Sequence, residues 1–483
     1  MTNKRISFLI ARQFCRSAFR SNALYAILLV MAVMIGFAAY SGWKIYTTQN
    51  AIRQHYQHEV RASWENNPDK HPHRMAHFGS FAFRAKHPLS MFDFGLESFV
   101  GNAVYLEAHR QNTVNFSEAG FSTGLLRFGE ISLAVLLQVV LPLIIFFLGF
   151  ASVSEEREGG TLKILLTQNV SWRDILVGKS LGIFLLAMCI AIPAVAVTLF
   201  LILGTAQNVL ITDTLLRFAG IAGVYLIFIA VLCVITVLIS AASASSKSAL
   251  MKLLAIWLFM IVLLPRTTQA LGSYFYPSPS KIEFDTAVEL DVLKEGDSHN
   301  PDDPHYKTLR DSVLRVYRVD SVQQLPFNYS GFVMREGERI SAEIFRRHLD
   351  KLIATYKKQN RINELTAWIN PYAAVRNISM ALSATDFESY VVFQQEAERY
   401  RYQLAQTMNE LQMKFISNQK QVPDDKPYTI SHEHWKALPD FKPQQATIGT
   451  ALRHEAGSVL ALVMWSILSV LFLIRLSKKA KAV

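Results

Sequence analysis

Residues 154–166 read Ser154-Glu155-Glu156-Arg157-Glu158-Gly159-Gly160-Thr161-Leu162-Lys163-Ile164-Leu165-Leu166, and they lie between two long apolar runs. Charged side chains are costly in hydrocarbon, so the apolar run of residues 131–153 must leave the membrane here. Gly159 and Gly160 allow the chain to turn sharply before a short amphipathic segment. The stretch therefore predicts a charged helix-turn element at the cytoplasmic face of a membrane protein.

This stretch and the residues after it resemble a segment of the permease subunits of ABC transporters of the second exporter type. In that family the segment reads roughly Glu-Arg-Glu-x-Gly-Thr-Leu, then an apolar pair, then Arg-x-Ile and Gly-Lys. The matching positions here are Glu156, Arg157, Glu158, Gly160, Thr161, Leu162, Leu165, Leu166, Arg173, Ile175, Gly178 and Lys179.

The resemblance implies that the stretch is a coupling helix that fits a groove on a partner ATPase subunit. The residues expected to carry this contact are Glu155, Glu156, Arg157, Glu158, Gly159, Gly160, Thr161 and Leu162. The alternative is an ordinary solvated loop, whose charges only hold the helix ends out of lipid.

Composition and charge place the chain in a membrane. Its 483 residues are 51% hydrophobic, with a mean hydropathy of +0.21, which is too apolar for one soluble domain and too charged for a wholly embedded chain. The net charge of +11 is concentrated before the first apolar run and after the last one. This pattern predicts two cytoplasmic termini and accounts for the charge without nucleic acid. The resemblance implies the bacterial cytoplasmic membrane.

Cys15, Cys189 and Cys233 lie in or beside apolar segments, so no disulfide framework is expected.

The apolar runs predict an all-α polytopic membrane protein with six transmembrane helices, an N-terminal interfacial helix and a mainly helical extracytoplasmic domain. A signal peptide competes for the first run, but the basic lead is too long and the run too extended. The expected divisions are a cytoplasmic interfacial helix (1–21), a first transmembrane helix (22–43), a small extracytoplasmic domain (44–127), a second transmembrane helix (128–153), the coupling segment (154–179), transmembrane helices three to five (180–272), a large helical extracytoplasmic domain (273–455), a sixth transmembrane helix (456–476) and a basic cytoplasmic tail (477–483).

The two outer regions are similar to the large inserts of one subgroup of these permeases, which is linked by name to multicopper-enzyme maturation. In the first region the similarity lies in residues 72–83 and 88–95. In the second it lies in Pro326-Phe327-Asn328-Tyr329-Ser330-Gly331 and Leu382-Ser383-Ala384-Thr385-Asp386. The density of aromatic residues in the first region requires burial, which argues against disorder.

Histidines gather in the first outer region, where His71, His73 and His77 offer imidazole ligands for copper or zinc. The stronger interpretation is structural, because the spacing lacks cysteines or paired carboxylates and histidines beside prolines commonly occupy exposed turns. No metal site is therefore assigned.

Polar residues within and beside the spans mark a candidate pathway across the membrane. Gln138 and Pro142 lie in the second span, whereas Glu130 and Arg266 lie at outer boundaries. In the family the second and fifth helices line the route between two permease subunits, so the resemblance makes Gln138 a pore candidate. A hydrogen bond between helices explains Gln138 equally well.

The chain lacks a nucleotide-binding motif. Gly178-Lys179-Ser180 ends like a phosphate loop, but Arg173 stands where that motif needs glycine. The chain is therefore expected not to be an enzyme by itself, and ATP and Mg²⁺ are expected to bind a partner subunit. No zinc-protease or hydrolase-elbow motif occurs either.

These features predict a permease subunit that pairs with an identical or related permease and with cytoplasmic ABC ATPase subunits, and that drives export or envelope remodelling. The alternative is a membrane-anchored scaffold or mechanotransmitter that acts on an envelope protein without moving cargo. The spans hold almost no metal-ligating side chains, so an organic or lipid-like cargo, or an envelope protein, is favoured over a transition metal.

Overall fold

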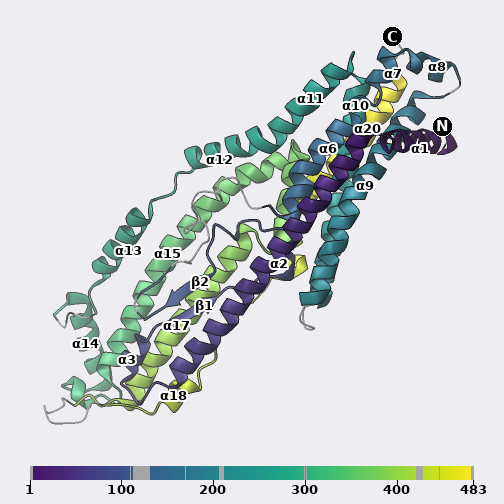
Figure 1. Ribbon diagram of the computed structural model, residues 1–483. Helices are drawn as coiled ribbons and strands as arrows, with labels where there is room; N and C mark the ends of the chain where they lie inside the picture. Colours follow the sequence, from purple (N-terminus) through teal and green to yellow (C-terminus); the bar gives the residue numbers. More distant parts are fainter. Residues whose placement is uncertain are drawn as a thin grey trace.

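The computed structural model describes residues 4–108, 110–112, 131–168, 170–205, 211–298, 300, 302–419, 428–444 and 446–479. Six of its helices are long and apolar enough to cross a membrane (Figure 1). These helices span Asn22–Glu65, Leu133–Glu158, Trp172–Thr205, Ile211–Ala241, Ser246–Phe275 and Ala456–Lys478. The prediction of an all-α polytopic membrane protein is confirmed.

The elements form a membrane bundle and an elongated outer body. The bundle contains α1 (Lys4–Ala18), α2 (Asn22–Glu65), α5 (Leu133–Val135), the π-helical turn η3 (Leu136–Val140), α6 (Leu141–Gly149), α7 (Ser154–Glu158), α8 (Thr161–Thr167), α9 (Trp172–Thr205), α10 (Ile211–Ala241), α11 (Ser246–Leu258), the π-helical turn η5 (Phe259–Leu263), α12 (Leu264–Phe275) and α20 (Ala456–Lys479). The outer body contains α3 (Pro72–Ala76), β1 (Ser80–Phe83), η1 (Pro88–Met91), β2 (Ala103–Leu106), α13 (Lys281–Glu295), α14 (Pro304–Tyr317), η6 (Val322–Gln324), α15 (Tyr329–Leu365), η7 (Thr366–Trp368), α16 (Pro371–Leu382), α17 (Phe387–Phe415), α18 (Glu433–Lys436) and α19 (Ile448–His454).

Helix α2 runs without a break from the membrane bundle into the outer body (Figure 1). It contains 44 residues, which corresponds to a rod of about 66 Å. The sequence predicts a span that ends at Trp43, where the side chains become polar. The helix continues because residues 44–65 contain no glycine or proline, so the change at Trp43 is one of solvent and not of backbone.

The turns η3 and η5 each lie just before a proline, Pro142 and Pro265. Proline lacks an N–H group and clashes with the carbonyl four residues back, and a π-helical turn is one way to relieve that clash without ending the helix. In η3, the carbonyl of Val139 accepts a 3.0 Å hydrogen bond from the Trp257 indole. Pro265 therefore does not end the fifth membrane helix, which continues to Phe275.

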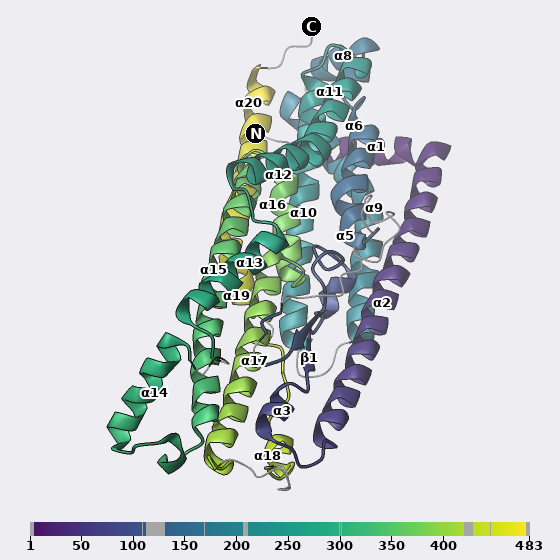
Figure 2. The ribbon, with the colours of Figure 1, turned by 90° about the vertical axis from the view of Figure 1, so that its left-hand side faces the viewer.

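The C-terminal end of α15, η7 and α16 form a helical hairpin that enters the membrane bundle. Buried residues of α16 belong to the same core as the membrane helices, and Figure 2 shows α16 beside α10. At the tip, the Asn370 amide donates to the Met260 carbonyl at 2.7 Å, and the Trp465 indole donates to the Ala367 carbonyl at 3.2 Å. Met260 lies about 21 Å along its helix from Ser246, well within the hydrocarbon thickness. This hairpin departs from the expected purely extracytoplasmic domain. It can lie within the bundle because its backbone groups are satisfied inside the protein.

The two outer inserts share their cores. Strands β1 and β2 pair antiparallel, with Phe81 opposite Tyr105, and pack against α17 through a cluster that includes Phe393. A second cluster joins Trp64 of α2 to Trp435 of α18. The inserts, which the sequence divides into two domains, thus form one body at the distal end of α2 (Figure 2).

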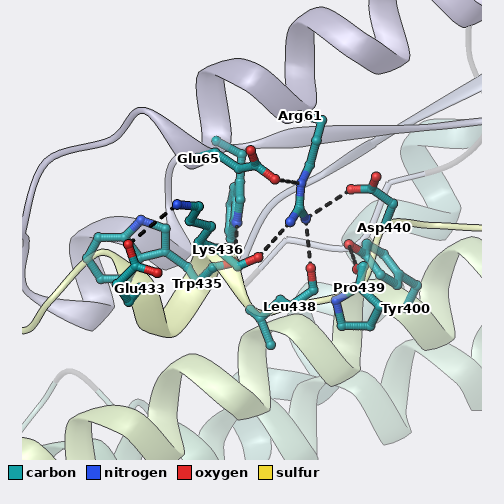
Figure 3. Close-up of polar contacts among 10 residues, drawn as sticks. Arg61, Glu65, Tyr400, Glu433, Trp435, Lys436, Leu438, Pro439 and Asp440 are labelled. Atoms are coloured by element: carbon teal, nitrogen blue, oxygen red, sulfur yellow. Dashed lines mark hydrogen bonds and ion pairs between the residues drawn. The ribbon is translucent and has the colours of Figure 1, made fainter.

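Arg61 fastens the segment around α18 to α2 (Figure 3). Its guanidinium donates to the carbonyls of Lys436 at 2.6 Å and Leu438 at 2.7 Å, and to the Asp440 carboxylate at 3.0 Å. The Glu65 carboxylate, one turn along α2, pairs with the remaining nitrogen. This planar fork holds a chain segment that has little secondary structure of its own.

Candidate functional site

The charged stretch that opens the sequence forms α7, a turn at Gly159–Gly160, and α8. Gly160 has a φ of +76°, a conformation that side-chain-bearing residues rarely adopt. The N–H groups of Val153 and Ser154 both donate to the Ser240 hydroxyl, at 3.0 and 3.1 Å. The element is therefore attached to the end of α10 where α7 begins.

Arg157 and Glu158 connect α7 to the two helix ends on either side of the next turn. The Arg157 guanidinium donates to the carbonyls of Ala241, at 2.7 Å, and Ser243, at 2.5 Å, at the C-terminus of α10. The Glu158 carboxylate accepts from the N–H and the hydroxyl of Ser246, at 3.2 and 2.7 Å, at the N-terminus of α11. Each charge opposes the helix dipole that it meets, a cation at a C-terminus and an anion at an N-terminus.

Two further residues attach the element to α9 and to the core. The Glu156 carboxylate pairs with the Lys179 ammonium, which also lies 5.4 Å from the centre of the Phe14 ring of α1. Leu162 is fully buried. The α7–α8 element is thus bonded to α9, α10 and α11.

The opposite face of the element is exposed. Glu155 and Thr161 are exposed, and Ile164 is 57% exposed although it is apolar. The residues that sequence analysis treats as one set therefore divide into anchors, namely Glu156, Arg157, Glu158 and Leu162, and a free face.

Gly178 and Gly182 serve helix packing. A Cβ at Gly178 would lie 2.7 Å from both the Ser7 carbonyl oxygen and Ile10 of α1. The Ser7 hydroxyl donates to the Asp174 carboxylate at 3.2 Å across the same contact. The motif that ends like a phosphate loop is therefore the interior of α9, where glycines let α1 approach closely.

Gln138, a pathway candidate, is buried in a polar network. Its amide donates to the Tyr225 hydroxyl, which lies 3.1 Å from the Ser379 hydroxyl, and Ser379 donates to the Asp93 carboxylate. Burial raises the pKa of Asp93, which belongs to the outer segment before β2. The network joins η3, α10, α16 and the first insert, so Gln138 does make hydrogen bonds between helices.

Gln138 and Arg266 also line the same cavity, which has a volume of about 660 Å³. Pro142 is buried and does not line it. Glu130 lies outside the described residues. Two of the four pathway candidates are therefore brought together.

Sequence analysis missed Arg217, an arginine near the start of α10 that is 1% exposed. Its guanidinium pairs with Asp213 at 2.6 Å and donates to the Leu382 carbonyl at 3.2 Å and to the Ala446 carbonyl. The spacing of Asp213 and Arg217 was the available signal, because residues four apart face each other on a helix.

The outer histidines have structural partners. The His71 ring caps α3 by accepting from the His73 N–H at 3.2 Å, and burial lowers the pKa of His71. The rings of His73 and His77 lie 4.8 Å apart, and His77 is 3.8 Å from the Glu107 carboxylate. Within the described residues, no group of three His, Cys, Asp or Glu side chains is placed to hold a metal ion.

Six apolar helices joined to a helical outer body define a multi-pass membrane protein. Residues 281–444 match a family model described as a domain of unknown function (DUF3526). That match covers the outer body from α13 through α18, including the hairpin that enters the bundle. No match was found among curated proteins.

Proposed function

We propose that this chain is the permease subunit of an ATP-driven ABC transporter, and that it works with a second permease chain and cytoplasmic ATPase subunits. ATP and Mg²⁺ would bind the ATPase subunits. The observation that carries the proposal is the two-sided character of the α7–α8 element, with an exposed face on α8 and charged anchors on α7.

The anchors explain how force would pass from the partner into the membrane. Arg157 and Glu158 bond directly to the ends of α10 and α11, and Glu156 bonds to α9. Movement of α8 would therefore be delivered to three membrane helices at once. A solvated loop needs no such set of matched contacts, whereas a coupling element requires them.

Cysteine cross-linking tests this proposal. Thr161→Cys and Ile164→Cys, placed in a chain whose native cysteines are replaced by serine, are expected to form cross-links to a co-purified ATPase subunit. Leu290→Cys on the exposed face of α13 is the matched control, because it lies on the outer body. Absence of cross-links at both positions, or ATP hydrolysis by the purified chain alone, would contradict the proposal.

A mechanotransmitter is the second candidate, and the continuity of α2 favours it. One helix links the membrane bundle to the distal Arg61 contacts, so a tilt of α2 would displace the outer body. Two glycines inserted after Gln49 are expected to abolish action on an envelope partner while leaving ATP hydrolysis intact. If the variant acts on the envelope partner as the unaltered chain does, the mechanical role is excluded.

A further inference from the structure

The cavity beside Gln138 lies at the outer surface of the membrane bundle. It is bordered by η3, by η5 and α12, by the end of α15 and by α16. Arg266 follows Ser246 by twenty residues on a continuous helix, a rise of about 30 Å, which equals the thickness of the hydrocarbon layer. The Arg266 guanidinium therefore lies at the level of lipid head groups.

The charge of the cavity favours an anion. Its charged lining residues are Arg266, Arg376 and Asp93. The Asp93 carboxylate already accepts hydrogen bonds from Ser379 and from the Gly95 N–H at 3.1 Å, and it attracts Arg376. Within the described part of the chain, Arg266 has no ion-pair partner. The charge of Arg376 is thus balanced by Asp93, whereas the guanidinium of Arg266 is available for a ligand.

The rest of the lining is amphipathic. The side chains of Asn360 and Asn363 contribute polar amides to the lining, whereas Val135, Ile261 and Pro265 supply apolar surface. A volume of about 660 Å³ accepts a head group together with the first part of an acyl chain.

We propose that this cavity binds an anionic amphiphile of the phospholipid class, with its phosphate at Arg266 and its chains against η5. The exposed Leu263 and Phe259 of the same helix give the acyl chains an apolar surface. Binding follows from the cavity alone, and the role of this lipid as cargo rests on the proposed function.

Native mass spectrometry of the full chain, purified without ATPase subunits, tests the binding. Dioleoyl phosphatidylglycerol is the probe, dioleoyl phosphatidylcholine is the uncharged comparison, and glycerol 1-phosphate is the head group without chains. We expect retention of phosphatidylglycerol above the other two, and roughly tenfold weaker binding in Arg266→Gln.

Arg453→Gln is the matched control, because Arg453 is exposed at the outer end of the sixth span and does not line the cavity. It is expected to bind phosphatidylglycerol as the unaltered chain does. Equal retention of both lipids, equal weakening in the two variants, or binding of glycerol 1-phosphate as tight as that of the lipid would overturn the inference. None of these outcomes depends on ATPase coupling, so failure here is separate from failure of the proposed function.

Discussion

The guanidinium of Arg157 donates a 2.7 Å hydrogen bond to the carbonyl oxygen of Ala241, the last residue of α10. A second nitrogen of the same guanidinium donates to the Ser243 carbonyl, so Arg157 holds two carbonyls with a two-pronged hydrogen-bonding fork. Arg157, which the motif would place in a contact with a partner, thus holds α7 to the end of α10.

Arg157→Ala is expected to leave the carbonyls of Ala241 and Ser243 without a donor and to destabilise the chain by about 1.5–3 kcal/mol. Arg157→Lys keeps the charge but loses the fork, so it should recover only part of that stability. Thermal unfolding in detergent measures both effects. Equal stability of the alanine variant and the unaltered chain would show that the fork is dispensable.

Gly178→Ala should displace α1 from α9, because a Cβ there would lie 2.7 Å from the Ser7 carbonyl oxygen. The Cys15 thiol, which donates to the Gly182 carbonyl at 3.4 Å and has a pKa raised by burial, should then react faster with maleimide. The measurement uses a chain in which the exposed Cys189 is serine. Gly223→Ala, which meets no neighbour within 4 Å, should leave the rate unchanged.

The buried pair of Arg401 and Glu338 is expected to be essential to the outer body. Arg401 is 1% exposed and donates to Glu338 at 2.6 Å and to Glu398 at 2.7 Å, so Arg401→Ala removes the guanidinium that balances the buried Glu338 carboxylate and should cost about 3–5 kcal/mol. Arg339→Ala, which breaks a half-exposed pair with Glu336, should cost less than about 1 kcal/mol. Hydrogen exchange across α15 and α17 distinguishes the Arg401→Ala and Arg339→Ala variants. Similar losses of protection in both variants would show that the Arg401–Glu338 pair is not essential.

Glu455, just before the sixth span, should make stability fall as pH rises. Burial, with the nearby carboxylates of Glu364, Asp386 and Glu388, raises its pKa from 4.5 to about 7. The folded chain therefore binds this proton more tightly, so the contribution is full below pH 4.5 and is lost as pH approaches 7. Glu455→Gln should flatten the dependence of the unfolding temperature on pH between these values. Glu410→Gln, at an exposed position, should leave this dependence unchanged. If neither substitution changes the dependence of the unfolding temperature on pH, Glu455 is not its source.

The six spans follow from the sequence because hydrocarbon imposes a length and a composition that single apolar runs reveal. Their ends do not follow. A change from apolar to polar side chains at Trp43 marks the end of the hydrocarbon but not the end of α2. At Pro265 the helix continues, because a π-helical turn just before the proline relieves its clash with the preceding turn. The polarity of the side chains indicates the solvent around a helix, and neither a change of polarity nor a single proline is enough to locate its end.

The hairpin at α16 and the Asp93 network were beyond sequence analysis, because both depend on contacts between distant parts of the chain. Ser379 and Asp93 are separated by 286 residues. The charged α7–α8 element could be located by its motif, but its division into anchors and an exposed face required the positions of Ser246 and Ala241. A pattern of residue types identifies an element and leaves its partners undetermined.

We propose that the exposed face of α8 receives movement from an ATPase subunit, and the ATPase rate of the assembled complex with Ile164→Asp provides the decisive test. Ile164 is 57% exposed, so the substitution should leave folding and assembly intact. We predict a hydrolysis rate that falls to that of the ATPase subunit alone, while Gln168→Asp, at the exposed end of α8, has a smaller effect. An unchanged rate in a complex that still contains Ile164→Asp would contradict the claim.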